Sequence, residues 1–423
     1  MDDEKIFGRV FFSLSFGEAI KDEILSDYRV VIVGVDKPMI AEWIENRELL
    51  KTSSGEITDA ESLASQIGLI KAIKDYDLKR IISFHSRVKR AESFATETQN
   101  SIQNIIKKHV PKGKIWADFV SGAMSSHKRK IKLDQLKDLS LGDRGILSNA
   151  KCLSEGVDVP ALDGVAFIDP KGSQIDIVQA VGRAIRLSQE KKVGTIFLPV
   201  FLQEGDDAEL SIQSSNFKPV WSVLNALKSH DDVLSAELDQ LRTNLGRKKF
   251  QGKIKSIPKV IIDLPPSVDE SFAESLKTIL VERTTESWNF WFGLLEDYVE
   301  KEGHTLIPIR YESQDGSRLG LWVSAQRQKR KNYKITGEQI SKLDSIGFDW
   351  DPLNSIWEEG FNCLEMFVKH EGHALVPARH INSDGFRLGQ WVNDQREREG
   401  ELSFERKSRL DSIDGWTWDV LTF

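Results

Sequence analysis

Short apolar, β-branched runs alternate with longer amphipathic segments over residues 24–204. A strand buried on both faces of a parallel sheet is apolar along its whole length, so we interpret these runs as strands. The segments Arg87–Lys108 and His127–Leu139 have the spacing of amphipathic helices. Strands that alternate with helices predict a mostly parallel α/β sheet. The predicted strands are Tyr28–Val35, Arg80–Phe84, Ile115–Val120, Gly145–Ser148, Gly164–Ile168 and Gly194–Phe201.

The pattern becomes polar and irregular over residues 205–284. Helical periods occur near Val220–Leu227 and Val233–Leu245, and the segment Ile257–Pro266 is predicted to be extended. No residue pattern typical of catalysis falls in this stretch. We therefore interpret it as a partly helical connector, and residues 1–23 as a lead-in to the first strand.

From residue 285 onward the sequence repeats itself with an offset near 69 residues. Trp288 and Trp357 mark the starts of two units, 285–353 and 354–423, and both units contain Glu-Gly-His and Asp-Gly-x-Arg-Leu-Gly. Such regular duplication indicates a repeated structural module. Each unit predicts one helix ending at Glu-Gly-His, a loop with Pro and Gly, and two further helices. The expected fold class is thus a parallel α/β domain, a connector and two small all-α repeats.

Composition and charge limit the setting of the protein. The chain has 423 residues, of which 40% are hydrophobic and 29% charged, typical of a water-soluble globular protein. Two cysteines cannot build a disulfide framework, no apolar run reaches about 18 residues, and the N-terminus is too acidic for a signal peptide. We expect a cytoplasmic protein without a membrane span. Because the net charge is −7, any nucleic-acid contact must come from local basic faces.

The strongest chemical signal is the sequence Gln-Ala-Val-Gly-Arg-Ala-Ile-Arg at 179–186. On a helix, Gln179, Arg183 and Arg186 would share one face, at i, i+4 and i+7. Two permanent cations suit phosphoryl oxygens, and Gly182 permits close approach of a ligand. The alternative is a solvated basic helix end.

A second pattern precedes this one in the chain. Residues 148–160 begin where a predicted strand ends, and they turn at Gly156. Gly156 can present backbone amides, while Asp158 can accept a hydrogen bond from a ribose hydroxyl or hold an arginine. Alone, this stretch would be interpreted as a surface turn, but a strand and then the 179–186 helix follow it.

This ordered pair resembles motifs V and VI of superfamily 2 helicases, and residues 81–86 resemble their motif IV. The resemblance covers residues 24–204 and implies the second RecA-like domain of such a motor. It implies that Arg183 and Arg186 act as arginine fingers on ATP and Mg²⁺, which the first RecA-like domain mainly binds. It further implies nucleotide contacts by Gly156, Asp158, Gln179 and Gly182, and nucleic-acid backbone contacts by His85, Ser86 and Asn149.

The two repeats are similar to the helicase-associated domain, which occurs in tandem behind such motors in bacterial proteins, and this resemblance implies nucleic-acid binding. Basic side chains beside aromatic rings can hold phosphates and stack bases. Alternatively, the tryptophans form the core and the charges a solvated face. His304 and His373 recur without a second recurring ligand, so no metal site is expected. The candidate nucleic-acid residues are Arg318, Trp322, Arg327, Arg330, Lys331, Arg387, Trp391 and Arg396.

The sequence contains no Gly-Lys-Thr/Ser phosphate loop and no Asp-Glu-x-His or Asp-Glu-x-Asp. We therefore expect the ATP-binding half in another domain, in cis or in trans, and no ATP hydrolysis by this chain alone. A split gene, a truncation and a fragment all fit this pattern. The expected function is the C-terminal half of a helicase or translocase, with DNA favoured over RNA. The alternative is a non-catalytic protein that binds nucleic acid or a partner.

Overall fold

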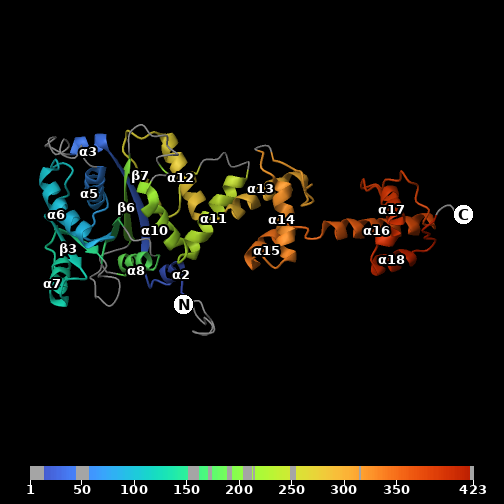
Figure 1. Ribbon diagram of the computed structural model, residues 1–423, viewed down its shortest axis with the longest axis horizontal. Coiled ribbons are helices and arrows are strands. Elements are labelled where there is room, and N and C mark those ends of the chain that lie inside the picture. Colours follow the sequence, from blue (N-terminus) through green and yellow to red (C-terminus); the bar gives the residue numbers. More distant parts are fainter. Residues whose placement is uncertain are drawn as a thin grey trace. The chain divides into compact units, whose positions relative to one another are not determined.

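The computed structural model describes residues 14–43, 57–150, 162–169, 174–187, 193–202, 212, 215–247, 254–313 and 316–419. The chain divides into two compact units, Met1–Gly293 and Leu294–Phe423 (Figure 1). The first unit contains the sheet and the second contains most of the repeat region.

The first unit is built on a parallel sheet of seven described strands in the order β3-β4-β2-β5-β6-β1-β7. Each of the six predicted strands is present, with ends that shift by only a few residues. The predicted α/β fold class is confirmed. The strands are β1 Asp27–Asp36, β2 Arg80–His85, β3 Ile115–Ser121, β4 Arg144–Ala150, β5 Gly164–Asp169, β6 Val193–Leu202 and β7 Val260–Asp263.

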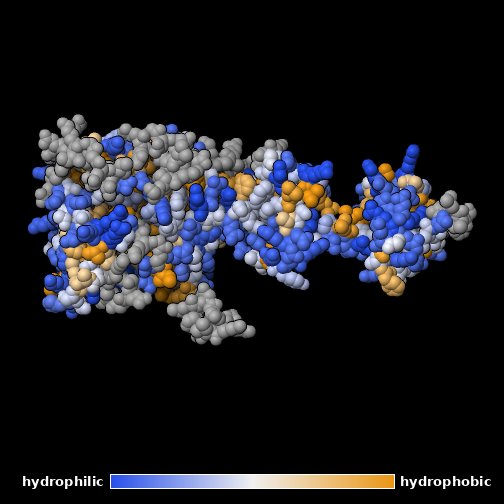
Figure 2. Space-filling view, viewed as in Figure 1, coloured by the Kyte–Doolittle hydropathy of each residue, from blue (hydrophilic) through white to orange (hydrophobic). Residues whose placement is uncertain are grey.

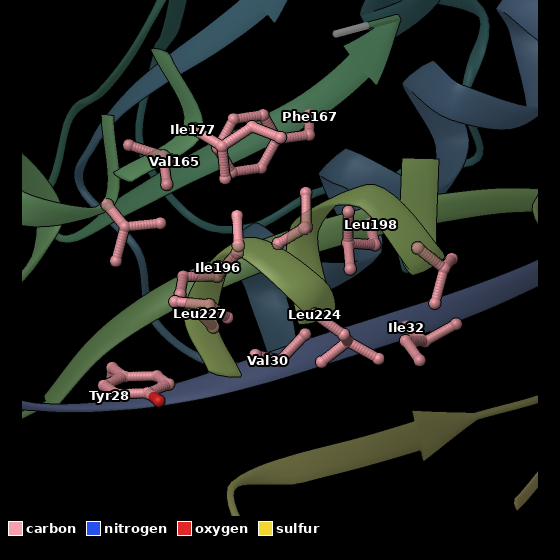
Figure 3. Packing of buried hydrophobic residues seen from close by; sticks show 14 of the residues in the cluster. Tyr28, Val30, Ile32, Val165, Phe167, Ile177, Ile196, Leu198, Leu224 and Leu227 are labelled. Atoms are coloured by element: carbon pink, nitrogen blue, oxygen red, sulfur yellow. The ribbon is translucent and has the colours of Figure 1, made fainter. Parts of the chain in front are cut away.

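Strand β1 lies between β6 and β7 and is buried on both faces. Tyr28, Val30 and Ile32 belong to the core on one face, whereas Val31 and Val33 belong to the core on the other. Figure 3 shows the first of these cores, where side chains of β1 and β6 meet helix α10 (Lys218–Lys228). The period of two along a strand explains this division.

Helices cover both faces of the sheet (Figure 1). The core around Tyr28 receives side chains from α7, α8, α10, α11 and α12, and the opposite core receives them from α3, α5 and α6. The helices of this unit are α2 Phe16–Lys21, α3 Lys37–Trp43, α5 Ile57–Asp75, α6 Val88–Asn104, α7 Ser126–Lys137, α8 Gln174–Ala184, α10 Lys218–Lys228, α11 Asp232–Gly246 and α12 Glu270–Thr284, with a 3-10 turn η2 Ser215–Phe217.

The stretch predicted as a connector is an integral part of this core. Its two predicted helices are α10 and α11, and its predicted extended segment contains β7, which pairs in parallel with β1 from Val30 to Val33. Helix α12 was not predicted. Leu224 of α10, Leu238 of α11 and Leu280 of α12 are almost fully buried against the sheet. The 205–284 stretch therefore supplies much of the cover on one face of the sheet.

A buried carboxylate joins the start of β1 to this cover. Asp231 is 0% exposed, accepts a hydrogen bond from the Leu234 backbone N–H (3.0 Å), and caps α11. It also accepts from the Tyr28 hydroxyl (2.7 Å) and lies 3.3 Å from the Lys259 ammonium. Lys259 in turn lies over the Tyr28 ring and pairs with Asp27 at 3.0 Å. Burial and the Asp231 carboxylate raise the pKa of Tyr28, so its hydroxyl stays a donor.

A row of buried polar side chains crosses β2 and β4. The Ser83 hydroxyl donates to the Ser148 hydroxyl (3.0 Å) and lies 3.0 Å from Nε2 of His85. The His85 ring is 6% exposed and packs against Phe94. Burial lowers the pKa of His85 from 6.5 to about 4, so the imidazole is neutral near pH 7.

The repeats have the predicted arrangement of helices. In each, a long helix ends at the Glu-Gly-His motif, a loop follows, and two shorter helices complete the module. Trp357 and Trp391 are buried in the core of the second repeat. The helices are α13 Ser287–Glu302, α14 Leu319–Lys331 and α15 Gly337–Ser345 in the first repeat, and α16 Pro352–Glu371, α17 Leu388–Glu397 and α18 Phe404–Asp411 in the second, with a 3-10 turn η3 Glu399–Glu401.

The loop of each repeat packs directly on the start of the following helix. A Cβ at Gly320 would lie 2.1 Å from the Pro308 carbonyl oxygen, and one at Gly389 would lie 2.1 Å from the Pro377 carbonyl oxygen. The Gly320 N–H donates to the Tyr311 carbonyl at 3.1 Å. The recurring glycine is therefore required by a close backbone approach.

We expect Asp231→Ala to destabilise the first unit by about 3–5 kcal/mol, because it removes a helix cap and leaves Lys259 and Tyr28 without their buried acceptor. Hydrogen–deuterium exchange of β1 and α11 peptides measures this. The control is Asp232→Ala, whose exposed carboxylate accepts from Ser15. Equal protection of β1 in the two variants would show that Asp231 does not hold β1.

Acid should destabilise the first unit through His85. The unfolded state binds a proton at this ring below pH 6.5 and the folded state only below about pH 4. Stability is therefore lost as pH falls through that window, by about 3 kcal/mol. Urea midpoints at pH 7 and pH 4.5 should show a smaller acid loss for His85→Asn than for the wild type. The matched variant His370→Asn, at a side chain that is 85% exposed, should behave like the wild type.

We expect Gly320→Ala to destabilise the first repeat by about 1–3 kcal/mol, because the added methyl overlaps a backbone carbonyl. Hydrogen–deuterium exchange should accelerate in α14, while α17 stays protected as an internal reference. Gly337→Ala is the control, since apart from chain neighbours and its own helix backbone no described atom lies within 4 Å of its Cβ position. Faster exchange in both variants alike would contradict the packing argument.

Candidate nucleotide and nucleic-acid sites

The two candidate arginines lie at and just beyond the end of α8. Helix α8 ends at Ala184, so Arg183 lies on it and Arg186 does not. The prediction that both arginines share one helical face is wrong in this respect. Arg186 instead forms an isolated antiparallel bridge with Leu25, and the Ser26 N–H donates to the Ile185 carbonyl at 2.8 Å. These contacts with the segment before β1 end the helix early.

The guanidinium groups of Arg183 and Arg186 nevertheless influence each other. Burial, and then the charge of Arg186, lower the pKa of Arg183. Two cations held together repel each other, and a bound polyanion relieves that repulsion. The two arginines are therefore candidates for contact with an anion.

The rest of α8 leaves room for a ligand near these cations. Apart from its chain neighbours and the backbone of α8 itself, no described atom lies within 4 Å of a Cβ placed on Gly182. The side-chain oxygen of Gln179 is buried and accepts no hydrogen bond from the described residues. A buried amide oxygen without a donor costs free energy, which a ligand or another domain can recover. Gly156 and Asp158 lie outside the described residues.

The carboxyl ends of β2, β4 and β5 meet at one edge of the sheet, where ligands bind in open α/β folds. At this edge the Ser86 hydroxyl donates to Asp169, and Arg90 pairs with the same carboxylate at 2.8 Å. His85 and Asn149 are 6% and 3% exposed. Their predicted contacts with nucleic acid stay predictions, and in this structure both side chains are beneath the surface.

Asp169 and Arg90 are residues of this edge that the sequence analysis missed. The available signal was position, because Asp169 is the last residue of β5 and Arg90 lies in the first turn of α6. Asp169 holds Ser86 in place, so the loop after β2 is fixed by the end of β5.

The candidate residues of the repeats fall into two groups. Arg318, Arg330, Lys331 and Arg387 are exposed and available to a partner. Arg318 lies 3.5 Å from Glu312, and both side chains are largely exposed, so this pair holds the arginine only weakly.

Arg327 and Arg396 instead connect segments of their own repeats. Arg327 donates to the Asp349 carbonyl (2.8 Å) and the Thr305 carbonyl (3.1 Å). Arg396 makes the equivalent bonds to Thr417 (2.9 Å) and Ala374 (3.4 Å). Burial lowers the pKa of both guanidiniums. Their recurrence thus has a structural explanation, and their contact with nucleic acid stays a prediction.

The recurring aromatic rings are mostly buried. Trp391 is 7% exposed and packs against α16 where Gly360 leaves space for the indole. The Trp357 indole N–H donates to Gln395 at 3.0 Å. The alternative that the tryptophans form a core therefore describes Trp391, whereas Trp322 is only partly buried.

The recurring histidines also have local contacts. Nδ1 of His304 accepts from the Leu306 N–H, and Nδ1 of His373 accepts from the Leu375 N–H, each at 3.3 Å. Among the described residues, no group of three or more His, Cys, Asp or Glu could hold a metal ion. No described helix has the length and apolar character needed to cross a membrane.

Residues 67–188 match the family of the helicase conserved C-terminal domain. Residues 285–351 and 354–419 each match the helicase associated domain. The helicase conserved C-terminal domain match spans α8 and most of the sheet. The two helicase associated domain matches coincide with the internal duplication.

The chain is also similar to two viral proteins that are named as helicases. The chain is 26% identical over 408 residues to "Probable helicase A859L" of African swine fever virus (strain Badajoz 1971 Vero-adapted), covering 89% of this chain and 42% of that protein. It is 32% identical over 103 residues to "Putative helicase 22" of Sulfolobus islandicus filamentous virus, covering 24% of this chain and 18% of that protein. The chain thus spans less than half the length of these relatives, and a bacterial source stays a prediction because both are viral.

The fold is shared with the "ATP-dependent Type ISP restriction-modification enzyme LlaBIII bound to DNA". The TM-score is 0.53 at 20% identity, over 97% of this chain and 34% of that one. At this identity the likeness concerns the RecA-like helicase fold alone. The domain matches show that the chain carries a helicase conserved C-terminal domain and two helicase associated domains.

Proposed function

We propose that this chain is the C-terminal half of an ATP-dependent superfamily 2 nucleic-acid helicase or translocase. It supplies arginine fingers and nucleic-acid contacts to a first RecA-like domain, in cis or in trans. The sequence has neither a Gly-Lys-Thr/Ser loop nor an Asp-Glu-x-His, so we assign phosphate and Mg²⁺ binding to that domain.

The observation that supports the proposal most strongly is the placement of Arg183 in the last turn of α8 and of Arg186 two residues beyond the helix end. ATP with Mg²⁺, when bound against this face, supplies the phosphoryl group to be transferred. Arg183 and Arg186 then neutralise charge that develops on its oxygens. The open surface at Gly182 and the buried acceptor of Gln179 fit a nucleotide or the facing domain. Gly156 and Asp158 complete the cleft in this proposal.

Nucleic acid is the proposed partner of the sheet edge and of the repeats, with DNA favoured over RNA. Exposed cations in both repeats, such as Arg318 and Arg387, can neutralise phosphates. The structurally similar restriction-modification enzyme is described as ATP-dependent and bound to DNA. That description supports the proposed partner of this chain, while the activity of the restriction-modification enzyme is said of that enzyme alone.

A non-catalytic binding protein is the second candidate, favoured by the absence of a phosphate loop from this sequence. It predicts nucleic-acid or partner binding without hydrolysis, whatever domain is added. The motor proposal predicts that hydrolysis appears when a first RecA-like domain is supplied.

The test is MgATP hydrolysis by the chain alone and by the chain combined with a first RecA-like domain that bears the phosphate loop. We expect no hydrolysis alone and DNA-stimulated hydrolysis in the combination. Arg183→Ala or Arg186→Ala should lower kcat by about 10³-fold or more, because charge on the transferring group loses its partner. Lys218→Ala, at an exposed residue at the start of α10, is the matched control.

Hydrolysis that survives both arginine substitutions would refute the arginine-finger assignment. Hydrolysis by the purified chain alone, lost in Arg183→Ala, would show that this half assembles a complete site. Binding without hydrolysis in every combination would support the non-catalytic candidate.

A further inference from the structure

The two repeats share a fold but differ in charge at the same place. The eight residues 327–334 at the end of α14 contain five basic side chains and no acidic one. The matching eight residues, 396–403, contain two basic and three acidic side chains. Duplication makes each repeat a control for the other, so a feature confined to one repeat is not required by the common fold.

We name Lys329, Arg330, Lys331, Tyr333 and Lys334 the α14 basic end. All five side chains are exposed, and the face seen in Figure 2 is largely hydrophilic over α14 and α15. Among the described residues, Lys329, Lys331 and Lys334 form no ion pair. Arg330 lies over the Trp350 ring at 4.4 Å. These cations are therefore available to an external anion.

The corresponding place in the second repeat is electrically neutralised. Lys407 pairs with Glu399 at 2.5 Å, and Glu397 and Glu401 lie on either side of that residue in sequence. Carboxylates at these positions repel phosphate. The second repeat thus lacks the anion-attracting character of the α14 basic end.

Tyr333 is in a backbone conformation that an aromatic residue rarely adopts. Its φ is +55°, in the left-handed region, and it follows the last turn of α14. The Tyr333 N–H donates to the Arg330 carbonyl (3.1 Å), and the Lys334 N–H donates to the Lys329 carbonyl (2.8 Å). Glycine is the residue favoured at this position of a helix end. A bulky ring here costs stability.

No side-chain contact of Tyr333 within the described residues compensates for its backbone strain. Its side chain is 96% exposed, and no ring contact or hydrogen bond to it is present among the described residues. A strained, exposed aromatic among four cations indicates contact with something outside the chain. Helix-dipole effects explain cations in the last turn, but not Tyr333 and Lys334 beyond it.

We propose that the first repeat holds a single strand of nucleic acid on the α14 basic end, with Tyr333 stacked on a base, at a site that has no equivalent in the second repeat. The cations neutralise successive phosphates, and the ring supplies a flat apolar platform. An unpaired base offers its face to such a ring, whereas a duplex hides it, so the ring favours a single strand. An acidic protein would satisfy the cations but give the ring no matching surface. This inference rests on the nucleic-acid partner proposed above.

The decisive variant is Tyr333→Gly in the full chain, with binding to a fluorescent single-stranded oligonucleotide followed by anisotropy. We expect the affinity to fall about 5- to 100-fold, because one stacked base is lost. We also expect slower hydrogen–deuterium exchange at the end of α14, because glycine relieves the strain. Tyr333→Phe should retain the affinity. Phe404→Ala, at a ring of the second repeat that is 89% exposed, is the matched control.

The cations are tested by salt dependence. The triple variant Lys329→Ala, Lys331→Ala and Lys334→Ala should reduce the slope of log affinity against log salt by about 2, since each phosphate contact with a single strand contributes about 0.7. The matched triple Lys369→Ala, Arg379→Ala and Arg398→Ala removes exposed cations of the second repeat and should leave the slope unchanged.

Several outcomes would overturn the inference while leaving the proposed motor intact. The first is an equal reduction of the salt slope in the two triple variants. The second is an unchanged affinity of Tyr333→Gly for the oligonucleotide. The third is tighter binding of a duplex than of a single strand, with an affinity that does not change when Tyr333 is substituted. If the wild-type chain binds no oligonucleotide at low salt but retains an acidic protein through the same lysines, the nucleic-acid partner of the repeats is wrong as well. ATP hydrolysis with an added first domain is then measured separately and decides the motor proposal.

Discussion

A parallel strand buried in the middle of a sheet has to be covered by apolar side chains on both faces, and β1 imposes this requirement on the first unit. One cover comes from α3, α5 and α6. The other comes largely from α10, α11 and α12, which follow the strands in sequence. The Asp231 carboxylate fixes that second cover to Tyr28 at the start of β1. The stretch that leads from the RecA-like sheet to the repeats is therefore part of the sheet's own core.

The same dependence extends to the candidate nucleotide site. Arg186 is held by a bridge to Leu25, in the segment that leads directly into β1. Ser26 adds hydrogen bonds to the carbonyls of Ile185 and Arg186. The position of the second arginine is thus set by the start of β1 rather than by α8 alone. Electrostatic complementarity to a transferring phosphate needs such rigid placement, because reorganisation at the moment of reaction would be costly.

The sequence predicted the strands well because each is a short apolar run between turns, and β1 is the clearest case. Helix α5 was missed because it is buried on several sides, with Ile67, Leu69, Ile70 and Ile73 all near 0% exposed, so it shows no apolar stripe. The duplication located the repeats, and the site motifs came from residue order at 81–86, 148–160 and 179–186. Two features of the arginines could not be predicted from the pattern of residue types. Arg327 and Arg396 turned out to bind their own backbone, and Arg186 left the helix because of a contact with Leu25, over 160 positions away in the chain.

The central place of β1 also bears on how the chain is made. Its partners are β6, which begins at Val193, and β7, which begins at Val260. A strand that is apolar on both faces must therefore remain unpaired while the ribosome adds well over a hundred residues. The arginine contacts in the repeats close over only about twenty residues, so each repeat can fold as soon as it emerges. An exposed apolar strand that awaits its partners is prone to aggregate, so during synthesis the sheet, and not the repeats, carries this hazard.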